Sequence, residues 1–144
     1  MAWVTLAASD VQAAISVNEY TVYRRDSIQA GQADPITQLL TDVTNLVRGF
    51  AGRCVALGPV GTIPEKLKNA AVDIVIYRLE TRMKREPIAA RKAAHDNALD
   101  ILKLVGDRKF DLEEPTIPSE NSVAPQSLIN PRTRNFTWDT QDGL

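Results

Sequence analysis

Apolar residues recur at helical spacing between residues 35 and 51, which is the clearest periodic segment of the chain. Asp34 is a good N-cap, and Pro35 occupies the first helical position, where its missing backbone N–H costs little. Gly52 then predicts the C-terminal end of this helix. The apolar face that would pack against the rest of the protein consists of Ile36, Leu39, Leu40, Val43, Val47 and Phe50.

Two later periodic segments predict a pair of neighbouring antiparallel helices. The first begins near Thr62 and Glu65, which have the spacing of a capping box, and should continue for about 20 residues. The second restarts after Pro87 and ends near Gly106, and so few residues join the two that they must be antiparallel. Apolar positions are Leu67, Ala70, Ala71, Ile74, Val75 and Leu79 in the first, and Ile88, Ala94, Ala98, Ile101, Leu102 and Val105 in the second.

The two ends of the chain give weaker patterns. Ser9 and Gln12 resemble a capping box and predict a short first helix over about residues 10–16. Residues 16–32 predict a loop, because Tyr20, Val22 and Tyr23 suit extended chain and the residues from Gly31 onward show no apolar period. After Asp107 four prolines occur among Ser, Asn and Glu, which is typical of an extended arm.

These elements predict an all-α fold, a small helical bundle of about four helices with an extended C-terminal arm. Residues 1–112 would form the helical domain and residues 113–144 the arm. The expected core positions are Leu39, Val43, Val47, Ile74, Val75, Ala98, Ile101 and Leu102.

Composition narrows the class of protein. The 144 residues suit one domain, and 17 basic against 18 acidic side chains give a net charge of -1, so no overall field attracts nucleic acid or an anionic membrane. One cysteine, Cys54, excludes an intramolecular disulfide. The start "MAWVTLAASD" does not resemble a signal peptide, and no apolar run approaches the length that crosses a bilayer. We therefore expect a cytosolic protein without a membrane partner.

Conventional reactive motifs are not evident. His95 shares a helix face with Leu99, while Asp96 and Asp100 lie along another line, so these residues do not assemble a metal site. Cys54 has no neighbouring base and is better explained as a half-buried apolar filler. The sequence "GPVG" at residues 58–61 lacks the strand and the lysine of a phosphate-binding loop. We expect no cofactor, no metal and no catalytic activity.

One local charge excess is present. Between Arg78 and Lys92 six basic residues stand against two acidic ones, Glu80 and Glu86. A solvated helix end with a Glu80–Lys84 ion pair explains this charge excess as well as a binding surface does. Cations on adjacent turns repel one another unless something offsets them, so a subunit interface or a channel lining is the functional alternative. The residues expected in it are Arg78, Arg82, Arg85 and Lys92.

The order of these parts resembles the Mu-like family of small phage head-to-tail adaptor proteins, also called connector or head-completion proteins. The resemblance covers roughly residues 3–112 and is carried by "VRGFAGR", "LKNAAVDIVIYRLETR" and "ALDILKLVGDRKFDL". It weakens at "EYTVYRRDSIQAGQ" and ends before the arm. Its most informative positions are Leu67, Asp73, Ile74, Tyr77, Arg78 and Leu79, followed by Ala98, Leu99, Leu102 and Gly106.

The resemblance implies a structural virion protein of the neck region, assembled in the host cytoplasm. Copies would form a ring, commonly a dodecamer, that binds the portal protein, a downstream neck or tail-completion protein and packaged DNA in its channel. The arm would then attach to a partner through Phe136 and Trp138, with Arg132 and Arg134 paired to partner carboxylates. The alternative is a small helical DNA-binding accessory protein that uses the region from Arg78 to Lys92.

Overall fold

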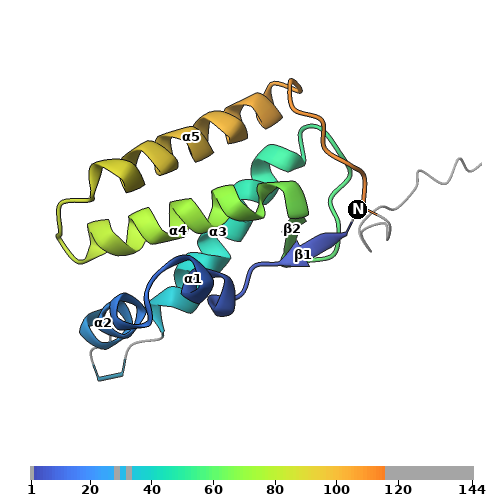
Figure 1. Cartoon of the computed structure of the whole chain (residues 1–144). Helices are drawn as coiled ribbons and strands as arrows, with labels where there is room; N and C mark the ends of the chain where they lie inside the picture. The colour runs from blue at the N-terminus through green and yellow to red at the C-terminus, as the bar shows by residue number, and fades with distance from the viewer. Residues whose placement is uncertain (1, 28–29, 32–33, 116–144) are drawn as a thin grey trace, which may run out of the picture.

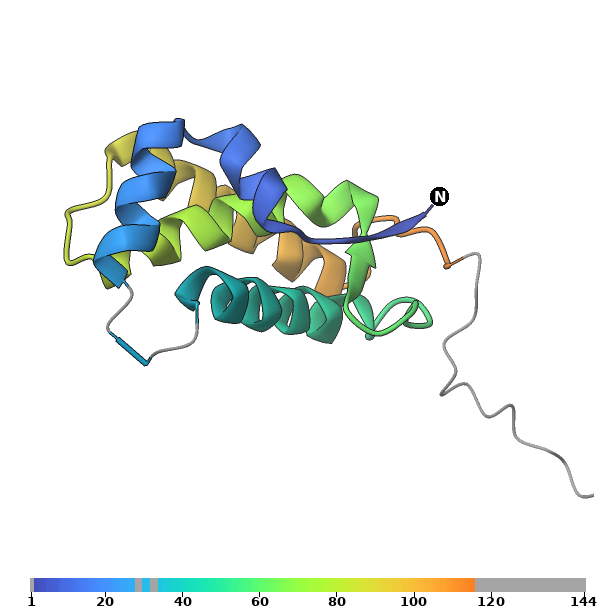
Figure 2. The ribbon, with the colours of Figure 1, turned by 90° about the horizontal axis from the view of Figure 1, so that it is seen from below.

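An antiparallel pair of long helices forms the centre of the molecule (Figure 1). In this computed structural model, which describes residues 2–27, 30–31 and 34–115, the pair consists of α4 (Lys68–Arg82) and α5 (Ala89–Gly106). A third long helix, α3 (Pro35–Ala51), packs against both (Figure 2). The all-α prediction is confirmed, with five α-helices in the described chain and one very short sheet.

The boundaries of α3 agree with the sequence prediction because they are set by local chemistry. The Asp34 carboxylate accepts a hydrogen bond from the Ile36 backbone N–H at 3.1 Å, and Pro35 starts the helix. Gly52 is the C-cap, and its N–H donates to the Arg48 carbonyl at 2.9 Å. Both ends of this helix could therefore be read from residues within one turn of them.

The core joins all three long helices. Six of the eight predicted core residues are buried, and Leu39 and Ile101 are partly buried against them. The middle of α4 is covered on more than one side, because it carries a broad apolar face. The confirmed buried positions are Val43, Val47, Ile74, Val75, Ala98 and Leu102.

The predicted loop over residues 16–32 is wrong, because Val17–Ser27 forms a helix, α2. Ser16 and Glu19 form the capping box that starts it: the Glu19 N–H donates to Ser16 Oγ at 3.3 Å, and the Ser16 N–H donates to Glu19 Oε2 at 3.4 Å. Tyr20 and Tyr23, one turn apart, are both buried. Tertiary burial of these rings overrides their preference for extended chain.

Two other predicted helix starts are also wrong. The first helix, α1 (Ala8–Ala14), begins and ends earlier than expected. Its N-cap is Ala7, whose N–H donates to the carboxylate of Asp10 at 2.9 Å. Thr62 does not cap α4, because its hydroxyl donates to the Pro59 carbonyl at 2.7 Å. It lies instead in a strand, β2 (Thr62–Pro64), which is followed by the 3-10 turn η1 (Glu65–Leu67).

The short sheet fixes one end of the molecule. Strand β1 (Trp3–Thr5) pairs antiparallel with β2, with Trp3 opposite Pro64 and Thr5 opposite Thr62. The segment after α5 returns to this same end, where Leu112 is 7% exposed (Figure 1). The α4–α5 turn lies at the opposite end, so the two ends are separated by the length of the helices.

Candidate functional site

The α4–α5 turn presents most of the predicted basic residues to solvent. Helix α4 ends at Arg82, and Ile88 is the N-cap of α5. The side chains of Arg82, Lys84, Arg85 and Lys92 are exposed, whereas that of Arg78 is half-buried on α4. Within the described ranges, none of the five has a hydrogen-bond or ion-pair partner for its side chain. The turn is therefore a cationic surface with an excess of positive charge, in which the acidic Glu86 stands against Arg82, Lys84 and Arg85.

Arg91 belongs to a different environment, although it lies in the same run of basic residues. Its Nη2 donates to both carboxylate oxygens of Glu19 at 3.1 Å, and its Nη1 bonds to Glu80. The Tyr23 hydroxyl accepts from Arg91 Nη1 at 3.2 Å and donates to Glu80 Oε1 at 3.3 Å. Arg91 thus joins α2, α4 and α5 in one polar cluster.

Glu80 is the centre of this cluster, which contradicts the expected Glu80–Lys84 pair. The Glu80 residue is 4% exposed and turns inward, while Lys84 lies beyond the end of α4. Its Oε2 atom is buried without a hydrogen-bond partner in the described part of the chain. A buried carboxylate needs a cation beside it. The cluster therefore serves first to stabilise the fold.

The pKa directions follow from this geometry. Burial opposes ionisation of Arg91, but the bonds to Glu80 and Glu19 more than offset it and raise the pKa of the guanidinium. Burial and the neighbouring Glu80 charge raise the pKa of Tyr23. For Glu19 the burial effect is outweighed by Arg91 and Ser16, and the pKa of its carboxyl is lowered. Glu19 and Arg91 are therefore both charged at neutral pH, and the Tyr23 hydroxyl is neutral.

His95 and Cys54 have ordinary packing partners. The His95 ring stacks on Tyr77 with centroids 4.0 Å apart, and its Nδ1 lies 3.3 Å from Asp96 Oδ1. The Cys54 thiol, half-buried, bonds to the Val105 carbonyl. Among residues whose positions the structure gives, no three His, Cys, Asp or Glu side chains lie close enough to hold a metal ion. No described helix is long and apolar enough to cross a membrane.

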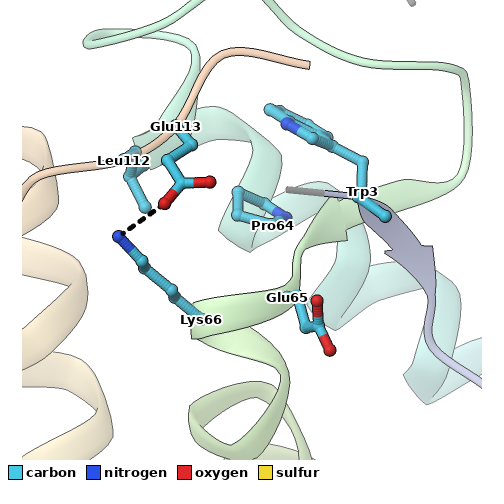
Figure 3. A pocket seen from close by; sticks show the side chains of 7 residues that line it. Trp3, Pro64, Glu65, Lys66, Leu112 and Glu113 are labelled. Atoms are coloured by element: carbon cyan, nitrogen blue, oxygen red, sulfur yellow. Dashed lines mark ion pairs between the residues drawn. The ribbon is translucent and has the colours of Figure 1, made fainter. Parts of the chain in front are cut away.

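A small pocket marks the opposite end, where the segment after α5 meets the sheet (Figure 3). Lys66 pairs with Glu113 at 3.4 Å and also donates to the Asp111 carbonyl at 3.4 Å. The Trp3 ring lies close to Gly58, where an added Cβ would come within 2.7 Å of the indole. The two contacts of Lys66 thereby fasten the described segment after α5 to the body.

Arg48 holds the loop beside this pocket. Its guanidinium donates to the carbonyls of Gly58, Pro59 and Thr62 at 3.1, 2.8 and 2.6 Å, and it lies 5.7 Å from the Trp3 ring centroid. The spacing of apolar residues does not predict this arrangement, although Arg48 lies in the "VRGFAGR" motif that carries the family resemblance.

The four predicted partner-binding residues of the arm, Arg132, Arg134, Phe136 and Trp138, lie outside the described residues. Residues that sequence reasoning missed are Glu19, Tyr23 and Arg91. The available signal was Glu80, a carboxylate that stands within the broad apolar face of α4 and needs a buried cation.

Comparison with known proteins places the chain in a family. No curated protein and no solved structure matches it. The model of the family described as "Bacteriophage Mu, Gp36" matches residues 6–128, which include all five helices and part of the arm. That range is most of the 144 residues. It confirms the Mu-like character of the earlier resemblance, and the chain belongs to the bacteriophage Mu Gp36 family.

Proposed function

We propose that the protein is a head-to-tail adaptor of a phage virion. Copies form a ring, a dodecamer in the simplest case, that binds the portal protein above and a neck or tail-completion protein below. The observation that carries this proposal is the family match over residues 6–128, since it spans the whole helical body. In this role the protein acts by assembly and DNA retention, and it needs no catalytic centre.

The arrangement of the body supports a linking role. The cationic turn lies at one end, and the arm leaves from the other end beside Lys66 and Glu113 (Figures 1 and 3). Two different partners can therefore be bound without competing for one surface. The arm would use Phe136 and Trp138 as anchors on the portal, and Arg132 and Arg134 would pair with portal carboxylates.

The test compares the full chain with a chain that ends at Pro115, because Leu112 is buried and must be retained. Both proteins are mixed with portal-bearing capsids, separated by sedimentation and viewed by negative-stain electron microscopy. We expect the full chain to bind at the portal vertex, and the shortened chain to remain helical by circular dichroism but to stay unbound. Binding of the full chain to capsids that lack a portal would contradict the proposal.

A second candidate, a DNA-binding accessory protein, is favoured by the unpaired cations of the α4–α5 turn. Such a protein would bind short duplexes with an affinity that falls steeply as salt rises. Reversal of charge at Arg82 and Arg85 would abolish that binding. Duplex binding at physiological salt by the free protein, with no binding to portal-bearing capsids, would favour this alternative over the adaptor.

A further inference from the structure

A groove of about 370 Å³ lies between α1 and the first half of α4. Its apolar lining comes from Val72, which is buried, and from Ala13 and Ala14, which are exposed on α1. Asp10 and Lys68 form an ion pair at 2.8 Å in its wall and so satisfy each other. The other lining residues are Asn69 and Asp73.

Asp73 is the unusual member of the groove. Its side chain is half-buried, and within the described part of the chain its carboxylate has no hydrogen-bond or ion-pair partner. Burial raises the pKa of this carboxyl, in contrast to the lowered pKa of Asp10, which has Lys68 and the Ala7 N–H. A partly desolvated carboxylate without a donor costs free energy. The groove therefore has a place for a cation that the described part of its own copy does not fill.

The α4–α5 turn has the complementary chemistry. Ile88 is 59% exposed, and the exposed Lys84 and Arg85 precede it by a few residues. Lys84 also has a φ of 53°, a left-handed conformation that favours glycine at this position after a helix. Arg108 after α5 has a similar φ of 59°, but its Nε donates to the Arg53 carbonyl at 3.1 Å. The ammonium of Lys84 makes no such contact within the described residues, so it is available to pair with a carboxylate.

The groove and the turn of one copy cannot meet. Asp73 and Lys84 are eleven positions apart along the direction of α4, which is about 16 Å at the helical rise per residue. Two copies can bring them together, and because the two surfaces differ, the contact is heterologous. Repetition of a heterologous contact produces a ring where the rotation closes.

We propose that the α1–α4 groove of one copy binds the α4–α5 turn of the next copy. Ile88 packs against Ala13, Ala14 and Val72, and a cation of the turn pairs with Asp73. The inference deepens the proposed function, since it names the contact between neighbours in the ring. Its test nevertheless uses only the purified full chain, with neither portal nor capsid, so that its failure is distinguishable from failure of the adaptor role.

The experiment blocks each surface separately. Ala13→Trp fills the groove from an exposed position, and Ile88→Ser removes the apolar residue of the turn. Sedimentation velocity should show concentration-dependent association of the wild-type chain, and each variant alone should associate at least about 10-fold more weakly. A mixture of the two variants retains one intact turn and one intact groove, and should form a dimer that grows no further.

Matched variants separate this contact from general effects of surface change. Ala56→Trp repeats the substitution at Ala13, and Val60→Ser is closely similar to that at Ile88. Both lie at exposed positions in another loop and should associate as the wild type does. Asp73→Asn should raise the melting temperature slightly, because it removes a poorly solvated charge, yet should weaken association. If Asp73 only affected the stability of its own copy, the melting temperature would not rise while association weakened.

Three results would overturn the proposal. The first is a wild-type chain that stays monomeric at every concentration up to the limit of solubility. The second is a mixture of Ala13→Trp and Ile88→Ser that remains monomeric. The third is association that tolerates Ile88→Ser while the turn binds duplex DNA, which would assign the turn to nucleic acid.

Discussion

Arg91 and the cations of the α4–α5 turn are close in sequence but differ in surroundings. Arg91 is bonded to Glu80, Glu19 and Tyr23, and only about a quarter of its side chain is exposed. Lys84 and Arg85 are exposed and have no side-chain partner among the described residues. A count of charges in the sequence treats all of them alike, yet one stabilises the fold and the others are available to partners.

The difference teaches how to divide a basic region into structural and binding residues. A cation with desolvated carboxylates around it is required by its own chain, because its loss would leave those carboxylates buried and unpaired. Exposed cations in a group repel one another, and contacts within the fold do not stabilise them. Only the second kind is a reasonable site for an anionic partner. Four predictions test this division, from the largest expected effect to the smallest.

Removal of the structural cation should have the largest effect. Arg91→Ala leaves Glu80 buried without its counter-ion, and loss of one partner of a buried pair typically costs about 3 to 5 kcal/mol. Lys92→Ala changes the next residue on the same helix, which is exposed, and should change the free energy of unfolding by less than about 0.5 kcal/mol. Urea denaturation of both variants measures the difference. Equal stabilities would show that Arg91 is a surface cation like its neighbours.

The cluster also shows why this site could not be predicted from sequence. The bounds of α3 follow from Asp34, Pro35 and Gly52, all of which act within one turn of the helix ends. Residues 19, 80 and 91 are joined only by the tertiary fold, and nothing in their spacing connects them. The start of α2 was different, because the Ser16–Glu19 capping box was present in the sequence. The helix was not predicted because Tyr20 and Tyr23, which follow the capping box, suit extended chain.

The hydroxyl of Tyr23 should have the next largest effect. It bonds to Arg91 and Glu80, and hydrogen bonding to a charged group contributes about 1.5 to 3 kcal/mol. Tyr23→Phe should therefore lower the free energy of unfolding by an amount in that range. Tyr20→Phe is the matched control, because Tyr20 is similarly buried on the same helix but is not part of the cluster. If both variants were equally stable, the hydroxyl would not contribute.

Lys84→Gly should have a smaller effect of opposite sign. Glycine adopts positive φ without a steric penalty, which is worth about 1 kcal/mol at such a position. Since the Lys84 side chain has no partner within the described residues, we expect a stability gain together with weaker association between copies. Arg108→Gly removes a bond to the Arg53 carbonyl and should gain less. A larger gain at residue 108 would contradict this distinction between the two helix ends.

Acidification should give the smallest effect, and its sign follows from Glu19. Its pKa is lowered in the folded protein, because Arg91 and Ser16 outweigh the effect of burial. The ion pair therefore contributes stability above the unfolded-state pKa of about 4.3, and this contribution is lost as the pH falls through the folded-state pKa. For a pair this exposed we expect about 1 kcal/mol or less.

The measurement is the free energy of unfolding between about pH 6 and pH 3, the window in which ordinary carboxyl groups titrate. Glu19→Gln should flatten the decline over this range but should not abolish it, because Asp10, whose pKa is lowered by Lys68 and the Ala7 N–H, contributes in the same direction. Asp10→Asn should remove a further part of the decline in the free energy of unfolding. An unchanged slope in Glu19→Gln would mean that Arg91 stabilises the fold through Glu80 and Tyr23 alone. Helix α2 would then be held to the helical pair by the burial of its two tyrosines and by the hydroxyl of Tyr23.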